Sequence, residues 1–183
     1  MTSPKSPRRR TLPLGVCVLA CNKHGQVLAV QRPEDTSLFS MPGGKLEEGE
    51  SFLEAAIREM QEETGILLSM DELVEVYRGE CEGTQRYDVA TFLAVGAQAE
   101  HLSPQEGEAA AQWVDASVLM DPERSPFSRF NRLALTEAHC EMQVLTSWMK
   151  LSPEEAAAWK ALESHLANTL ASADLRAGPI ATQ

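Results

Sequence analysis

The chain has 183 residues and carries 16 Lys and Arg against 27 Asp and Glu, a formal net charge of −11. This length suits one domain with a substantial core, and the acidic balance disfavours binding of a nucleic acid polymer through a general basic surface. The four cysteines are scattered, without a second Cys or His pair that would complete a zinc site. They are typical of free thiols in a reducing cytoplasm.

The N-terminal segment 1–10 is rich in Ser, Pro and Arg and predicts a disordered leader. The apolar run at 12–21 follows these basic residues and therefore imitates a secretory signal. A buried first strand is the alternative that we favour, because a turn signal at 22–25 leads into a partner strand at 26–31. No segment reaches the ~18 apolar residues that a membrane span requires. We expect a cytoplasmic protein that does not bind membranes.

A loop followed by a helix is predicted next. The Pro-Gly-Gly sequence at 42–44 cannot be helical and lets the backbone approach a ligand closely. Ser51 followed by Glu54 is a capping-box pattern, so the helix should begin at Ser51. Gly65 suits the left-handed position just past the helix end. The predicted helix has about 13–14 residues, which is near the usual length.

Three acids of this helix, Glu59, Glu62 and Glu63, have i, i+3, i+4 spacing and share one face. A second, apolar face should pack on a sheet. Such a run of glutamates is often just a solvated surface. Here the flanking glycines and the scarcity of nearby Lys and Arg side chains favour a site for a divalent cation. Mg²⁺ is usually coordinated by carboxylate oxygens together with substrate phosphates.

Beyond this helix, strands are predicted at 73–77, 85–95 and 112–114, the second with both faces apolar, as in a sheet covered on both sides. Asp115 should cap a short helix that ends at Met120. A long helix is predicted at 127–150, and Ser-Pro at 152–153 opens another that runs to about residue 171. Leu145, Trp148 and Met149 form an apolar stripe on the long helix. Such a stripe is more typical of a buried core than of an interface, and the alternative is that it forms a homodimer contact.

A specific pattern runs from Gly44 to Ile66: Gly, five residues, Glu, seven residues, then Arg-Glu-aliphatic-any-Glu-Glu-any-Gly-aliphatic. Every defined position is met, and in this the chain resembles the Nudix family over about residues 12–120. The resemblance implies an α/β (α+β) Nudix fold, a mixed β-sheet sandwiched between helices, here with two extra C-terminal helices. We expect a Nudix domain at 11–150, a helix at 151–173 packed on it and a loose tail at 174–183.

The resemblance also implies the chemistry. The chain would hydrolyse a pyrophosphate bond in a nucleoside diphosphate derivative or a nucleoside triphosphate, including an oxidised one, and release a nucleoside monophosphate. Mg²⁺ would be the cofactor, with Mn²⁺ as an alternative, because metal ions neutralise phosphate oxygens and activate water. The metal would be held by Glu59, Glu62, Glu63 and the Gly44 carbonyl. Among these acids, Glu59 and Glu62 are candidates for the catalytic base.

Arg58 and Glu50 resemble the orienting pair of this motif. The guanidinium would fix the carboxylates through charge-assisted hydrogen bonds, although a plain surface ion pair is the alternative. A small nucleotide is the expected partner, and its contacts would come from Arg32, Phe39, Gly43, Tyr87, Glu106 and Glu108. Phe39, in the loop before the glycines, Tyr87 and also Trp113 could stack on a base or simply pack in the core.

Glu106 and Glu108 precede the strand at Trp113 and would supply a further metal ligand or base, or else only surface charge. The signatures of coenzyme A and ADP-ribose subfamilies are not visible, so the chain is most similar to general MutT-like members. The alternatives are hydrolysis of ADP-ribose or dinucleoside polyphosphates, or a Nudix-fold sensor that binds a nucleotide without turnover.

Overall fold

The computed structural model describes residues 12–22, 24, 26–32, 35–81, 85–94, 101–105, 110–121 and 127–148, with seven single positions between 153 and 164. The expected leader at 1–10 and tail at 174–183 lie outside these residues, as does most of the helix expected at 151–173. In the described part of the chain, no helix is long and apolar enough to cross a membrane.

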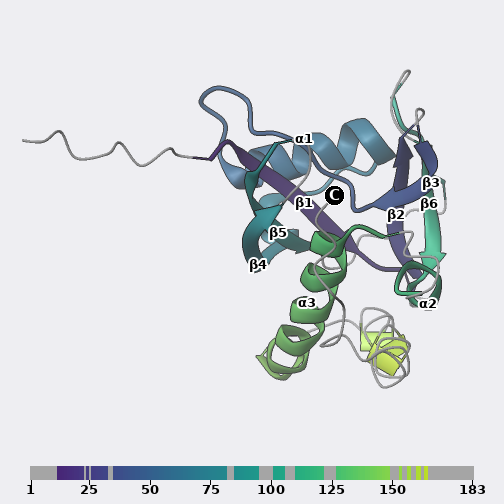
Figure 1. Ribbon diagram of the computed structural model, residues 1–183. Coiled ribbons are helices and arrows are strands. Elements are labelled where there is room, and N and C mark those ends of the chain that lie inside the picture. Colours follow the sequence, from purple (N-terminus) through teal and green to yellow (C-terminus); the bar gives the residue numbers. More distant parts are fainter. Residues whose placement is uncertain are drawn as a thin grey trace, which may run out of the picture.

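The elements follow the predicted order, with one strand added (Figure 1). They are β1 (Leu14–Ala20), β2 (Gln26–Arg32), β3 (Asp35–Ser40), α1 (Phe52–Thr64), the 3₁₀ turn η1 (Met70–Glu72), β4 (Leu73–Cys81), β5 (Tyr87–Ala94), β6 (Ala110–Asp115), α2 (Ala116–Leu119) and α3 (Arg129–Trp148). The predicted long helix at 127–150 is thus confirmed as α3, and the strand predicted at 85–95 as β5.

The strands form two three-stranded sheets, ordered β1-β5-β4 and β3-β2-β6. β1 and β5 are parallel, and the remaining paired strands are antiparallel, so the pairing is mixed and the α+β class is confirmed. The single sheet of the prediction is divided at the β1–β2 turn, where β1 and β2 meet at the bridge between Cys21 and Val27.

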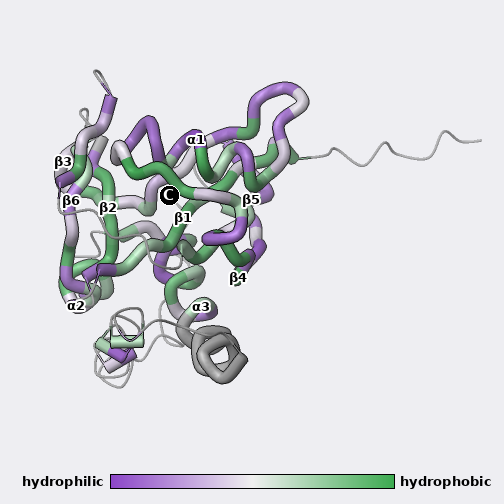
Figure 2. Tube along the Cα trace, turned by 180° about the vertical axis from the view of Figure 1, so that it is seen from behind, coloured by the Kyte–Doolittle hydropathy of each residue, from purple (hydrophilic) through white to green (hydrophobic). Residues whose placement is uncertain are grey.

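Two hydrophobic clusters lie on the two faces of β1. Val16, Val18 and Ala20 belong to the cluster that α1 covers, and the alternating residues, starting at Cys17, belong to the cluster that α3 covers. This follows from the period of two in a strand. α1 and α3 lie on opposite sides of β1 and β5 (Figure 1), and the apolar segments run along β1, β2 and β5 (Figure 2). This sheet is therefore sandwiched between helices, as predicted.

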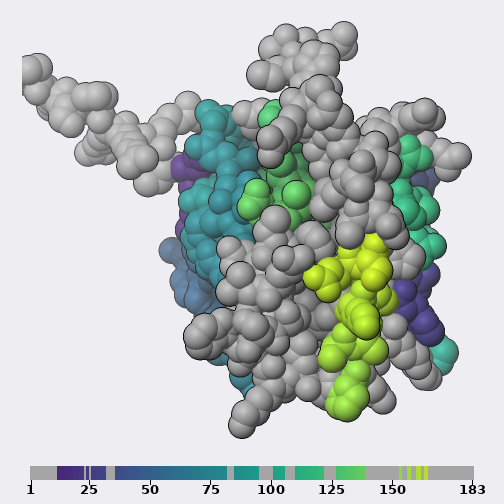
Figure 3. Space-filling model, turned by 90° about the horizontal axis from the view of Figure 1, so that it is seen from below, coloured from purple at the N-terminus to yellow at the C-terminus, as the bar shows by residue number. Residues whose placement is uncertain are grey.

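β3 was not predicted from the sequence, because its residues Asp-Thr-Ser-Leu-Phe-Ser lack an alternating apolar pattern. Pairing with β2 creates it: Ser40 lies opposite Val30, and Phe39 forms a bridge with Phe127 just before α3. The placement of Phe39 in a loop was therefore wrong. Seen from below, α3 lies between the surfaces of β4 and β6 (Figure 3).

Candidate active site

α1 begins and ends where the local sequence predicts. The Ser51 hydroxyl accepts from the Glu54 N–H, and the Glu54 carboxylate accepts from the Ser51 N–H at 2.8 Å, which completes the capping box. Gly65 ends the helix in the left-handed conformation, with φ of 78°. An N-cap of this kind contributes about 1 kcal/mol to helix stability. The face that carries the acids is thereby fixed in register.

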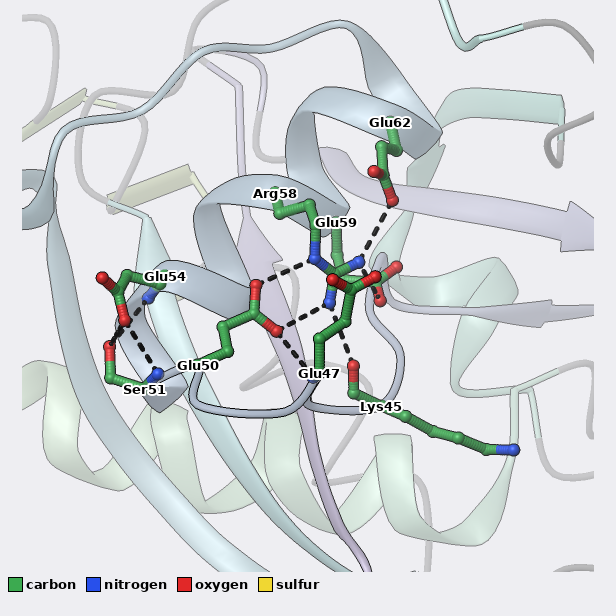
Figure 4. Close-up of polar contacts among 8 residues, drawn as sticks. All are labelled: Lys45, Glu47, Glu50, Ser51, Glu54, Arg58, Glu59 and Glu62. Carbon is green, nitrogen blue, oxygen red and sulfur yellow. Dashed lines mark hydrogen bonds and ion pairs between the residues drawn. The ribbon is translucent and has the colours of Figure 1, made fainter.

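Arg58 is the centre of the charged cluster (Figure 4). Its Nε and Nη2 donate to the two oxygens of Glu50 at 2.9 and 3.0 Å, a bidentate pair. Its Nη1 donates to Glu59 at 2.8 Å and to Glu62 at 3.1 Å, and Nη2 also donates to the Lys45 carbonyl at 3.0 Å. The Arg58 side chain is 22% exposed and Glu50 is 13% exposed. Such charge-assisted, partly buried bonds are stronger than surface ion pairs.

The glycine loop supports two of the three predicted carboxylate ligands. The Gly44 carbonyl accepts from the Val16 N–H at 2.9 Å, which ties the loop to β1. A Cβ on Gly44 would lie 2.2 Å from Glu59 Oε1, so a side chain at this position would displace the carboxylate. The Gly43 N–H donates to Glu63 Oε2 at 2.7 Å. Glu59 and Glu63 are therefore both held against the loop.

Among the described residues, no three His, Cys, Asp or Glu side chains converge as a metal-binding group. The arrangement shows why: Arg58 lies between Glu59 and Glu62, while Glu63 turns to the Gly43 N–H. The chemistry of the donor set nevertheless fits Mg²⁺ or Mn²⁺, because it consists of carboxylate oxygens and a backbone carbonyl that has a second lone pair.

One predicted substrate residue, Gly43, contacts the Glu63 carboxylate, whereas the predicted aromatic residues pack on the two hydrophobic clusters. Tyr87 and Phe39 are half-buried and pack on the cluster beneath α3, whereas Trp113 packs on the cluster beneath α1. Tyr87 donates to Gln85 at 3.2 Å, and the Lys45 ammonium lies 5.6 Å from its ring centroid. Lys45 thus links Tyr87 to the charged cluster, since its own carbonyl accepts from Arg58.

Arg32 ends β2, but its side chain lies outside the described residues, as do Glu106 and Glu108 entirely. Sequence reasoning missed two contributors. The Lys45 carbonyl takes a hydrogen bond from Arg58, and the segment 103–105 contacts the end of α1. Both act through backbone atoms, which leave no residue-type signal in a sequence.

Lowering the pH should remove the stabilisation contributed by Arg58 and Glu50. Hydrogen bonds from Arg58 are the main cause that lowers the pKa of Glu50 below its ordinary value of 4.5. Because the folded-state pKa is the lower one, the contribution is complete above the unfolded pKa and is lost as the pH falls through the folded pKa. We expect Glu50→Gln to be less stable than the wild type at neutral pH, and the difference to shrink in acid, by urea unfolding from about pH 7 to about pH 3.

A difference between the two proteins that stays constant over this range would contradict this account. Glu48→Gln is the matched control, because it removes the same charge from an exposed position two residues away.

Comparisons with known proteins bear on the family and the fold. The NUDIX domain model matches residues 11–133. An 8-oxo-dGTP diphosphatase from Proteus vulgaris is 45% identical over 49 residues, 25% of this chain and 44% of that protein. The m7GpppN-mRNA hydrolase NUDT17 from Xenopus laevis is 31% identical over 136 residues, 63% of this chain and 45% of that protein. The chain spans less than half the length of both relatives.

Among solved structures, the MutT protein from Methanosarcina mazei Go1 superposes with a TM-score of 0.60. The match covers 74% of this chain and 98% of that one at 22% sequence identity, so it supports the fold alone. The domain match, in contrast, covers most of the chain and includes the whole motif from Gly44 to Ile66. On this evidence the chain belongs to the Nudix family.

Proposed function

We propose that the chain is a divalent-metal-dependent pyrophosphohydrolase. It cleaves the pyrophosphate bond of a nucleoside diphosphate derivative or a nucleoside triphosphate and releases a nucleoside monophosphate. The single observation that supports this best is the Arg58 cluster, in which one guanidinium contacts Glu50, Glu59 and Glu62 beside a glycine loop. A solvated acidic helix face would not be organised around one partly buried cation.

In this proposal Glu59, Glu62, Glu63 and the Gly44 carbonyl hold Mg²⁺ or Mn²⁺. When bound, the metal would supply positive charge that neutralises phosphate oxygens and makes water easier to deprotonate. Arg58 and Glu50 are positioning residues, because their bidentate pair fixes where Glu59 and Glu62 can point. Either Glu59 or Glu62 takes the proton of the attacking water, since both carboxylates lie at the cluster.

The proposal is less specific about the substrate and the residues that contact it. Gly43, Tyr87 and Phe39 are the candidates for nucleotide contacts among the described residues, together with Arg32, Glu106 and Glu108. The names of the two relatives point to two substrate classes, an oxidised nucleoside triphosphate and an RNA cap. The former suits a strongly acidic chain better, because a small metal-bound nucleotide needs no extended basic surface. The catalytic unit would be the domain at 11–150.

A panel of substrates with Mg²⁺ tests the proposal. It should include dGTP, 8-oxo-dGTP, ADP-ribose, a dinucleoside polyphosphate and a cap dinucleotide, with monophosphate release measured by chromatography and Mn²⁺ as a second metal. We expect turnover of at least one triphosphate that EDTA abolishes. Tight nucleotide binding without any metal-dependent product would instead assign the chain as a sensor module.

A further inference from the structure

The C-terminal turn of α1 is closed by a segment that lies about forty positions away in the sequence. The last carbonyls of a helix have no partners within it and must find others. Here the Ser103 N–H donates to the Thr64 carbonyl at 2.9 Å, and the Gln105 N–H donates to the Glu62 carbonyl at 2.8 Å. We call residues 103–105 the strap, because they hold the helix end at two points.

The close approach of the strap depends on Gly65. A Cβ on Gly65 would lie 2.6 Å from the Ser103 carbonyl oxygen and 3.0 Å from its carbon. The residue also has φ of +78°, which side chains rarely adopt. Between the two donors stands Pro104, whose ring fixes its own φ and stiffens the segment. The strap is thus a short, restrained backbone segment seated directly on the helix end.

Glu62 is held both through its side chain and through its backbone. Its carboxylate accepts from Arg58 at 3.1 Å, and its backbone carbonyl accepts from Gln105. Helix ends fray unless their carbonyls are satisfied, and Glu62 and Glu63 belong to the final turn of α1. A frayed turn would move both carboxylates relative to Glu59, which lies one turn earlier against Gly44.

We propose that the strap is a positioning element of the metal site: it sets the affinity for the divalent cation by holding the last turn of α1. This inference rests on the proposed function, since it takes Glu62 and Glu63 as metal ligands. Linkage then gives a second consequence. If the strap raises the affinity for the metal, bound metal must stabilise the closed strap by the same factor.

The first test compares Gln105→Pro, which removes the N–H donor, with Gln105→Ala, which keeps it. Mn²⁺ binding is measured without substrate by electron paramagnetic resonance, and melting is recorded to check the fold. A backbone hydrogen bond contributes on the order of 1 kcal/mol, so Gln105→Pro should bind Mn²⁺ about fivefold more weakly. Gln105→Ala should bind like the wild type. Equal affinities for both variants would overturn the proposal.

The carboxylates of Glu106 and Glu108 follow the strap in the chain and could carry its effect. The loss caused by Gln105→Pro should therefore be measured again in a Glu106→Gln/Glu108→Gln background. If the strap acts through Glu62, the loss of about fivefold persists there. If the loss disappears, the acids rather than the strap position the metal, and the inference is wrong.

A second measurement uses the wild-type chain and decides the matter even if Gln105→Pro does not fold. Hydrogen exchange of the Ser103 and Gln105 amides is followed with and without Mg²⁺, with the Asn22 amide of the β1–β2 turn as reference. We expect both strap amides to slow several-fold relative to Asn22, and unchanged exchange would overturn the inference. A wild type that binds no Mn²⁺ would overturn the proposed function itself.

Discussion

Replacing Glu62 by Gln should lower kcat at least about a hundredfold. Changing a residue that only supports a metal ligand already costs about 10–100-fold, and Gln removes the charge of a proposed ligand outright. The side chain keeps its size, and Glu62 is 34% exposed, so the fold should survive. Steady-state turnover of the preferred substrate, measured over a range of Mg²⁺ concentrations, checks the prediction. Glu63→Gln should behave similarly.

Glu48→Gln provides the matched control for this experiment. Glu48 lies in the exposed turn before α1, within the same acidic stretch, and loses the same charge on substitution. Its kcat should stay within about twofold of the wild type, because surface changes away from a site have small effects. Full turnover by Glu62→Gln, at any Mg²⁺ concentration, would remove Glu62 from the metal site.

Replacing Arg58 by Lys should reduce both kcat and stability. A lysine ammonium cannot reproduce the planar fork that contacts both oxygens of Glu50 while also reaching Glu59 and the Lys45 carbonyl. Loss of a residue that positions a metal ligand lowers activity or metal affinity by about 10–100-fold. The free energy of unfolding should fall by about 1–3 kcal/mol, as expected when hydrogen bonds to charged groups are lost. Turnover and urea unfolding measure the two effects.

Arg86→Lys is the control, because Arg86 pairs with Glu80 on an exposed part of the surface. Exposed ion pairs contribute about 0–1 kcal/mol, so this variant should keep its stability and turnover. If Arg58→Lys changed neither quantity more than Arg86→Lys does, the Arg58 cluster would be an ordinary surface ion pair.

The sequence predicted the features that depend on neighbouring residues. The caps at Ser51 and Gly65 fix the limits of α1, because both act within one helical turn. The spacing of Glu59, Glu62 and Glu63 then sets which residues share a face, since helix geometry is the same everywhere. The burial of both faces of β5 could likewise be read from its apolar residues.

Sequence reasoning failed where contacts join distant segments. β3 exists because Ser40 and Asp35 pair with β2, and its own residues carry no strand pattern. For Phe39 and Tyr87 the sequence left nucleotide stacking and core packing open as alternatives, and only the structure shows that both pack on the cluster beneath α3. Side-chain type does not reveal which sheet face or cluster will take an aromatic ring.

By itself, then, the sequence determined the family motif, the limits of α1 and the set of acids that it carries. Only the tertiary structure decided which distant backbone groups those acids contact. Glu63 accepts from the Gly43 N–H, Glu59 lies beside Gly44, and the Glu62 carbonyl accepts from the Gln105 N–H of the strap. The reason is physical: local rules set φ, ψ and helix register, whereas these hydrogen bonds depend on backbone groups brought together from other parts of the chain by packing.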